Sequence, residues 1–179
     1  MNEGKISVRY AQSLFALAEE NNFQKEIYTS MERLTQAFFE VPALARTLAN
    51  PMHSPAEKLE LLITASACDP KSLLAHFFDF VIKKGREEFM VFISMSYQKI
   101  YREKERVVLG KITSAQPLTE DSIAKIRQLV DKQFSASIEL TTQVEPEILG
   151  GFVLEVDNYR MDSSIRTELE HIRTELLRD

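Results

Sequence analysis

Apolar residues in the first half of the chain recur every three to four positions, which predicts amphipathic helices. In the helix predicted over residues 71–84, the apolar positions cover an arc of roughly 200° at about 100° per residue. The helix predicted over residues 5–20 has an arc of the same width. Facing a single core needs only about half of that width. Either the chain buries both helices on two sides, or one edge of each helix faces a partner.

Four more helices are predicted in the first half. The start of one of these helices is marked by Ser54 as the N-cap residue, followed directly by a proline and three residues later by Glu57. Asp69-Pro70 is expected to open the helix over residues 71–84, and Gly85 to end it. The further helical segments are residues 24–40, residues 42–50, a helix that starts at Ser54, and residues 86–106.

The segment 86–106 changes character halfway. Its first part is apolar on nearly all sides, which predicts burial, whereas the part from Gln98 onward is strongly charged. We expect the charged part to leave the helical core. The gradient therefore predicts a domain boundary near residue 105.

Beyond residue 105 the hydrophobic period changes from helical to alternating. Strands are predicted over residues 107–115, 137–144 and 152–157, with a turn over residues 157–160. Two helices accompany them, one opened by Thr119 or Glu120 and one starting near Ser163. Their apolar stripes are Ile123, Ile126, Val130 and Phe134, and then Ile165, Leu169, Ile172 and Leu176.

These patterns predict a mainly α fold. An N-terminal six-helix bundle, residues 1–105, is followed by a small α+β C-terminal domain, residues 106–179. The first part carries 13 Lys and Arg against 14 Asp and Glu, and the second part 9 against 13. With a net charge of −5, the chain is an unfavourable partner for free nucleic acid.

The remaining composition excludes several classes. No apolar run reaches the ~20 residues of a membrane span, and the N-terminus lacks the apolar core of a signal peptide. We therefore expect membrane association only through partner proteins. The single cysteine, Cys68, excludes an internal disulfide and suits a reducing compartment.

Recognisable catalytic and metal-binding patterns are missing from the sequence. His53, His76 and His171 lie in different predicted elements, and His76 is expected on the solvated edge of its helix. Cys68 is expected to be a small buried residue rather than a nucleophile. Gly150-Gly151 is followed by a strand, whereas a phosphate loop needs a helix N-terminus. We expect no enzyme activity, no cofactor and no metal.

Short motifs follow one another along nearly the whole chain. They are Arg9-Tyr10-Ala11, Leu48-Ala49-Asn50-Pro51, Lys84-Gly85-Arg86, residues 114–119 (Ser-Ala-Gln-Pro-Leu-Thr), residues 145–151 (Glu-Pro-Glu-Ile-Leu-Gly-Gly) and Met161-Asp162-Ser163-Ser164-Ile165. In this order they resemble the δ subunit of F-type ATP synthase, the family of the mitochondrial oligomycin sensitivity-conferring protein. Glu145 stands where that family more often has Asp, and Glu87 where Leu often follows Gly-Arg.

The resemblance implies a non-catalytic stator subunit without a cofactor. Such a subunit links the top of the catalytic head to the peripheral stalk, so that rotation is coupled to ATP synthesis and proton transport. Residues 1–105 would bind the N-terminal helix of an α subunit through the first and fifth helices, and residues 106–179 would bind the b subunits of the stalk. The implied location is the cytoplasmic face of a bacterial inner membrane, as a peripheral part of the complex.

The two helices with over-wide arcs are the same two that the resemblance implicates. We expect their uncovered edges to form one apolar trough for the α-subunit helix, with Ala11 allowing close approach. Phe15 and Phe78 are expected to be exposed in the free protein, so that a charge there weakens binding without unfolding the bundle. The predicted partner-binding residues are Tyr10, Ala11, Leu14, Phe15, Leu74, Phe77, Phe78 and Val81.

The alternative function is an RNA-binding helical domain of the antitermination-factor type, which the first half resembles in helix count. That function requires a face rich in Arg and Lys. The near-neutral first half and the acidic second half disfavour it. A salt-dependent gel shift with RNA separates the two hypotheses.

Overall fold

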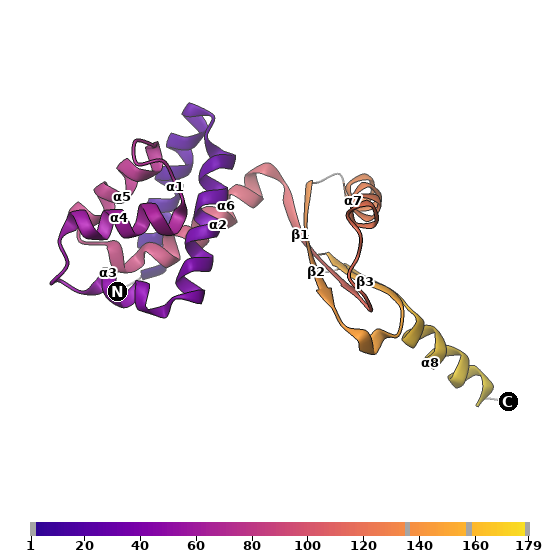
Figure 1. Ribbon diagram of the computed structural model, residues 1–179. Coiled ribbons are helices and arrows are strands. Elements are labelled where there is room, and N and C mark those ends of the chain that lie inside the picture. The colour runs from indigo at the N-terminus through magenta and orange to yellow at the C-terminus, as the bar shows by residue number, and fades with distance from the viewer. Residues whose placement is uncertain (1–2, 135–136, 157–158, 178–179) are drawn as a thin grey trace. The chain divides into compact units, whose positions relative to one another are not determined.

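The computed structural model describes residues 3–134, 137–156 and 159–177 (Figure 1). The chain is mostly helical with a small four-stranded sheet, and it divides into two units, Met1–Lys104 and Glu105–Asp179. The predicted boundary, after residue 105, falls one residue from this division. Independent folding of the two parts stays a prediction. Among the described residues, no helix is both long enough and apolar enough to cross a membrane.

The first unit holds the elements predicted as helices. These are α1 (Glu3–Asn21), α2 (Gln24–Glu40), α3 (Pro42–Ala49), α4 (Pro55–Ser66), α5 (Leu73–Lys83), the 3-10 turn η1 (Glu87–Phe89) and α6 (Met90–Glu105). The largest fully buried side chains of this unit include Leu14, Met31, Phe78 and Tyr97, so its core draws on α1, α2, α5 and α6.

The predicted start of α4 is confirmed by a reciprocal cap. The Glu57 N–H donates to Ser54 Oγ at 3.3 Å, and the Ser54 N–H donates to Glu57 Oε2 at 2.7 Å. The two bonds satisfy backbone donors that the first turn of a helix leaves unpaired.

Helix α5 starts later than predicted. Asp69-Pro70 belongs to a turn in which Asp69 Oδ1 accepts the Lys71 N–H, and Ser72 is the N-cap, accepting the Ala75 N–H at 3.2 Å. The end is as predicted: Gly85 has φ +62° and its N–H donates to the Ile82 carbonyl at 2.9 Å. Only a residue that tolerates a positive φ closes a helix in this way.

The expectation that the second half of α6 leaves the core is wrong. Gln98 and Tyr101 are buried, because the charged residues of this segment occupy the other face of the helix. The Tyr101 ring stacks on Tyr28 of α2 with centroids 4.2 Å apart. Gln98 Nε2 donates to Thr35 Oγ1 of α2 at 2.7 Å. Counting charged residues along the sequence did not show that they share one side.

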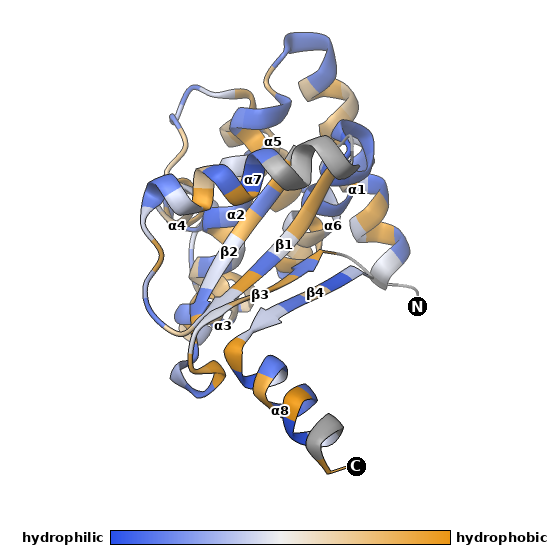
Figure 2. Ribbon diagram, turned by 90° about the vertical axis from the view of Figure 1, so that its right-hand side faces the viewer, coloured by the Kyte–Doolittle hydropathy of each residue, from blue (hydrophilic) through white to orange (hydrophobic). Residues whose placement is uncertain are grey.

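The second unit contains a mixed sheet with strand order β2-β1-β3-β4 (Figure 2). Its elements are β1 (Val107–Ser114), α7 (Glu120–Phe134), β2 (Ser137–Val144), the 3-10 turn η2 (Pro146–Ile148), β3 (Gly151–Val156), β4 (Tyr159–Ser164) and α8 (Ile165–Leu176). Strands β1 and β2 are parallel and joined through α7, whereas β1–β3 and β3–β4 are antiparallel.

One face of this sheet forms the small core of the second unit. Ile112, Ile138, Leu154 and Val156 are buried, and Ile126 of α7 packs against them. The side chains of Val130 and Phe134, predicted in the same stripe, lie outside the described ones. The other face is mixed: Lys111 lies opposite Glu155, and Thr113 lies opposite the buried Val153.

Strand β4 was not predicted from the sequence. It is a polar edge strand in which only Ser164 is buried, so it lacks the alternation that marks a half-buried strand. Of the predicted turn, residues 157 and 158 lie outside the described part and residues 159 and 160 belong to β4. Gly151, with φ +72°, makes the β3–β4 pairing possible, because an added Cβ would lie 2.0 Å from the Ser163 carbonyl oxygen.

Candidate partner-binding surfaces

An apolar groove of about 690 Å³ lies between α1 and α5. Its lining comes from two helical rows, with spacings of three and four residues. The lining residues are Arg9, Tyr10, Ser13, Leu14, Leu17, Leu73, His76, Phe77 and Phe80. The groove therefore has the shape and the apolar character that fit an amphipathic helix.

Tyr10 joins the two walls of the groove. Its ring meets Phe77 edge-on with centroids 6.4 Å apart, and it lies 6.1 Å from the Phe80 ring. The other apolar lining residues lie later on α1 and earlier on α5, such as Leu17 and Leu73. The two helices therefore run antiparallel along the groove, with Tyr10 and Phe80 at one end.

The polar groups of the groove are mostly engaged with the backbone. His76 is exposed, as predicted, and its Nδ1 donates to the Ser72 carbonyl at 2.8 Å, since a carbonyl oxygen only accepts. The Ser13 hydroxyl donates to the Arg9 carbonyl at 3.0 Å. The groups of the groove left for polar contacts with a guest include the Tyr10 hydroxyl, the His76 ring edge and the Arg9 guanidinium.

Three of the predicted binding residues, Tyr10, Leu14 and Phe77, line the groove. The other five are buried elsewhere: Ala11, Phe15, Leu74, Phe78 and Val81. Leu74 lines a second, smaller hollow, to which α2 contributes Glu26, Ile27 and Ser30.

The expectation that Phe15 and Phe78 are exposed in the free protein is wrong, because they are 4% and 0% exposed. Phe15 packs on Tyr97 of α6, with ring centroids 5.9 Å apart. Ala11 is also fully buried, so its small side chain serves packing within the unit rather than the approach of a guest helix. A charge at Phe15 or Phe78 would test the core and not the groove.

The most exposed apolar lining residues were left out of the predicted site. Leu17 is 46% and Phe80 48% exposed, and Leu73 is half-buried. All three belong to the predicted apolar arcs. The width of an arc does not tell which edge the rest of the chain covers, so the sequence alone did not separate them from Phe15 and Phe78.

Helix α8 carries a second uncovered apolar surface. Ile165, Leu169 and Ile172 are each about half exposed, and they share one side of the helix. The side chain of Leu176 lies outside the described ones. Helix α8 is held at its start, where the Ile165 N–H donates to the Gly150 carbonyl at 3.1 Å. Beyond that turn it extends away from the sheet of its own unit (Figure 1).

Two carboxylates with altered acidity are structural. Hydrogen bonds from the Ser164 hydroxyl, at 2.7 Å, and from the Ser164 N–H, at 3.0 Å, lower the pKa of Asp162. The Ser54 N–H and hydroxyl likewise lower the pKa of Glu57. Each carboxylate stabilises the start of a helix, α8 and α4 respectively, and neither lies in an apolar cleft of the kind that catalysis uses.

A buried ion pair connects α4 to η1. Lys58 Nζ lies 2.7 Å from Glu87 Oε1, and both side chains are largely covered. The other carboxylate oxygen, Glu87 Oε2, is buried without a hydrogen bond. The pair thus holds the turn η1, which follows the end of α5, against α4.

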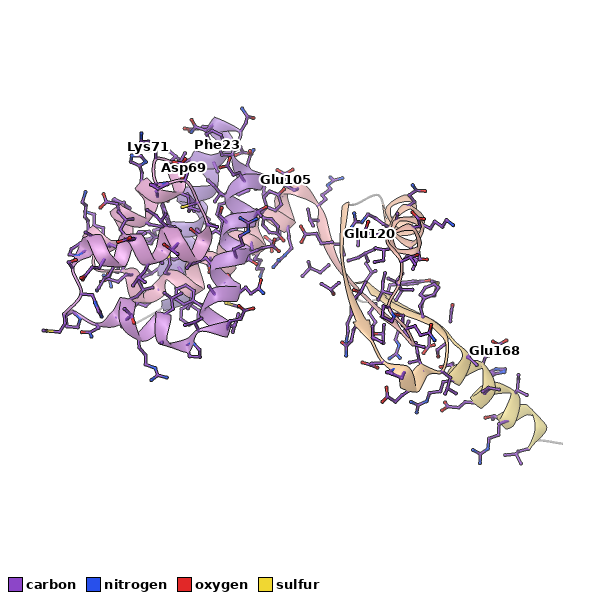
Figure 3. The ribbon with its side chains drawn as sticks, viewed as in Figure 1. Phe23, Asp69, Lys71, Glu105, Glu120 and Glu168 are labelled. Atoms are coloured by element: carbon purple, nitrogen blue, oxygen red, sulfur yellow. The ribbon has the colours of Figure 1, made fainter. Side chains whose placement is uncertain are left out.

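Within the described residues, no group of three or more His, Cys, Asp or Glu side chains could hold a metal ion. Cys68 is partly buried at the edge of a hollow of about 290 Å³ that Phe23, Asp69 and Lys71 also line (Figure 3). In the second unit, Figure 3 shows Glu120 and Glu168 in the first turns of α7 and α8. A carboxylate at this end of a helix interacts favourably with the helix dipole.

Comparison with known proteins identifies the family. Residues 6–176 match the family model "ATP synthase delta (OSCP) subunit". The chain is 35% identical to ATP synthase subunit delta of Bacteroides fragilis, over 99% of this chain and 96% of that protein. It is 34% identical to the subunit of Parabacteroides distasonis, over 99% and 98%.

The fold recurs in a solved structure. A chain of the Toxoplasma gondii mitochondrial ATP synthase hexamer, solved by cryo-electron microscopy, aligns with a TM-score of 0.59 at 18% identity, covering 96% of this chain and 97% of that one. The RNA-binding alternative finds no support in these comparisons. The chain therefore belongs to the ATP synthase delta (OSCP) subunit family, a non-catalytic stator component of the peripheral stalk of F-type ATP synthases.

Proposed function

We propose that the groove between α1 and α5 binds the N-terminal helix of an α subunit of the catalytic head. The observation that carries this proposal is the uncovered apolar edge that α1 and α5 share, at Leu17, Leu73 and Phe80. A monomeric protein rarely leaves a concave apolar surface of this size without a ligand. An amphipathic helix with anchors three and four residues apart would fill it.

The groove is formed before the guest helix arrives. Tyr10 is held between Phe77 and Phe80, and Leu14 is fixed in the core, so few side chains lose freedom on binding. Completing the burial of a half-exposed Leu or Phe contributes on the order of 1 kcal/mol. Several such side chains together supply a stable but reversible contact.

The second unit would bind the b subunits of the peripheral stalk through α8. The stripe of Ile165, Leu169 and Ile172 is convex and spaced for packing against another helix. Acidic residues flank the stripe, among them Glu168, whereas Glu170 is paired with Arg166 Nε at 3.2 Å. A basic stretch on the stalk helices would complement them, and this part of the binding would weaken with salt.

Through these two contacts the chain would join the catalytic head to the peripheral stalk. In this proposal residues 1–105 act as a six-helix bundle on the head, and residues 106–179 act as the stalk-binding domain. Membrane association comes only through the complex, on the cytoplasmic face of a bacterial inner membrane. The family membership and the two separate apolar surfaces support this division.

The test uses the full chain with two partners from the same genome: a peptide of the α subunit's N-terminal segment and a C-terminal fragment of the b subunit. Phe80→Asp should weaken peptide binding by tenfold or more and leave the b fragment bound. Leu169→Asp should do the reverse. Both side chains are about half exposed, so both variants should keep the thermal stability of the natural chain. Loss of both partners in either variant would contradict the division.

A further inference from the structure

The groove is apolar along most of its length but cationic at one end. At the end formed by Tyr10 and Phe80, Arg9 lines the groove, and Lys84 Nζ lies 5.7 Å from the centroid of the Phe80 ring. None of the ion pairs among the described residues includes Arg9 or Lys84. The opposite end, at Leu17 and Leu73, has no charged lining residue.

The nearby carboxylate does not neutralise this end. Asp79 lies 2.6 Å from Lys83 Nζ, one turn along α5, and is thereby engaged. The nine lining residues of the groove include no Asp or Glu. Two cations therefore stand beside an apolar surface, without a counter-charge from the described residues.

We infer that Arg9 and Lys84 form an anion-recognising end of the groove, and that they fix the direction in which the guest helix lies. This inference rests on the proposed function of the groove. The guest should carry at least one carboxylate beside its apolar stripe, placed at the end that lies next to Tyr10 and Phe80. A reversed guest would put that carboxylate at the Leu17 end, where no cation lines the groove.

The physical basis is the partial desolvation of both charges when the guest covers the groove. An arginine binds a carboxylate through two parallel N–H groups, which adds direction as well as attraction. An exposed ion pair contributes little to the free energy of binding. The apolar rings that shield one side of this pair from water raise that contribution only moderately. We therefore expect a clear effect on orientation and a modest effect on affinity.

The experiment is a double-mutant cycle with the full chain. The probes are the α subunit's N-terminal peptide and the same peptide with its carboxylates changed to amides. Arg9→Gln and Lys84→Gln should each weaken binding of the acidic peptide about two- to fivefold at low salt. The amide peptide should bind both variants and the natural chain equally. Raising the salt to about 0.5 M should remove most of the difference, because the Debye length then falls below ~5 Å.

Arg33→Gln is the matched control, because Arg33 is an exposed arginine on α2 outside the groove. It should leave both peptides unaffected. The direction of the guest is read from a spin label at either end of the peptide, which should broaden the signals near Tyr10 from the acidic end only.

Additive effects in the cycle, or a guest that lies in both directions, would overturn the inference. If Phe80→Asp still abolishes binding in that case, the proposed function stands and only the charged end is refuted. If Phe80→Asp leaves binding unchanged as well, the proposed function itself fails.

Discussion

The two units expose apolar surface in opposite ways. In the first unit the exposed side chains of Leu17 and Phe80 lie in a concave groove next to the core, so that Leu14 is buried and Leu17, one turn later, is 46% exposed. In the second unit Ile165, Leu169 and Ile172 lie on one side of α8, whose first turn is held by the bond from the Ile165 N–H to the Gly150 carbonyl. The groove is therefore tied to the stability of its unit, whereas the stripe of α8 is not.

This difference teaches where a substitution will act. A change on the floor of the groove alters folding first and binding as a consequence, whereas a change on α8 alters binding alone. The same distinction separates neighbouring residues of one helix. Phe78 and Phe80 are two positions apart on α5, yet one is completely buried and the other is 48% exposed.

The largest expected effect comes from that pair. Phe78→Ala should lower the free energy of unfolding by about 3–5 kcal/mol, because it leaves a cavity in a packed core. Phe80→Ala should lower it by less than about 1 kcal/mol, since half of the ring already meets water. Denaturant titrations of the two variants check this. Similar losses for both would show that the groove edge is covered in solution.

An intermediate effect is expected at the support of α8. Gly151→Ala should destabilise the second unit by at least about 2 kcal/mol, because a positive φ and a backbone clash at 2.0 Å act together. Gly85→Ala is the control: it has φ +62° with open space around it, so it should cost only about 1 kcal/mol. Circular dichroism during thermal melting measures both. Equal losses of stability in the two variants would mean that residue 151 has room for a Cβ next to the Ser163 carbonyl.

The smallest expected effect is that of pH on the two helix starts. The pKa values of Glu57 and Asp162 are lowered in the native protein. Their contribution to stability is therefore complete above the pKa of the unfolded chain, and it is lost as the pH falls through the lower native pKa. Glu57→Gln and Asp162→Asn should flatten the decline of the melting temperature in acid. An unchanged decline would show that other carboxylates cause it.

The fold could be predicted where one local pattern dominates. The Ser54–Glu57 cap, the Gly85 stop and the strand Ser137–Val144 each depend on a few adjacent residues, and each was placed correctly. Strand β4 depends on pairing with β3, because its own residues are polar. Tertiary partners decide such an element, so its sequence carries little sign of it.

The candidate site was predictable at the level of helices but not of residues. The wide apolar arcs of α1 and α5 predicted more apolar surface than a single core requires, and a groove does lie between these two helices. Which edge stays open depends on how α2 and α6 pack, as the contact of Phe15 with Tyr97 illustrates. That packing is a long-range property, and a helical period contains no information about it.

The central claim is that the first unit's groove, and not the stripe of α8, receives the α-subunit helix. Methyl-labelled full chain, titrated with the α subunit's N-terminal peptide, tests this directly by NMR. The account predicts that the methyl signals of Leu17 and Leu73 shift with peptide concentration, while those of Leu169 and Ile172 stay in place. Shifts at Leu169 and Ile172 with Leu17 and Leu73 unchanged would contradict it.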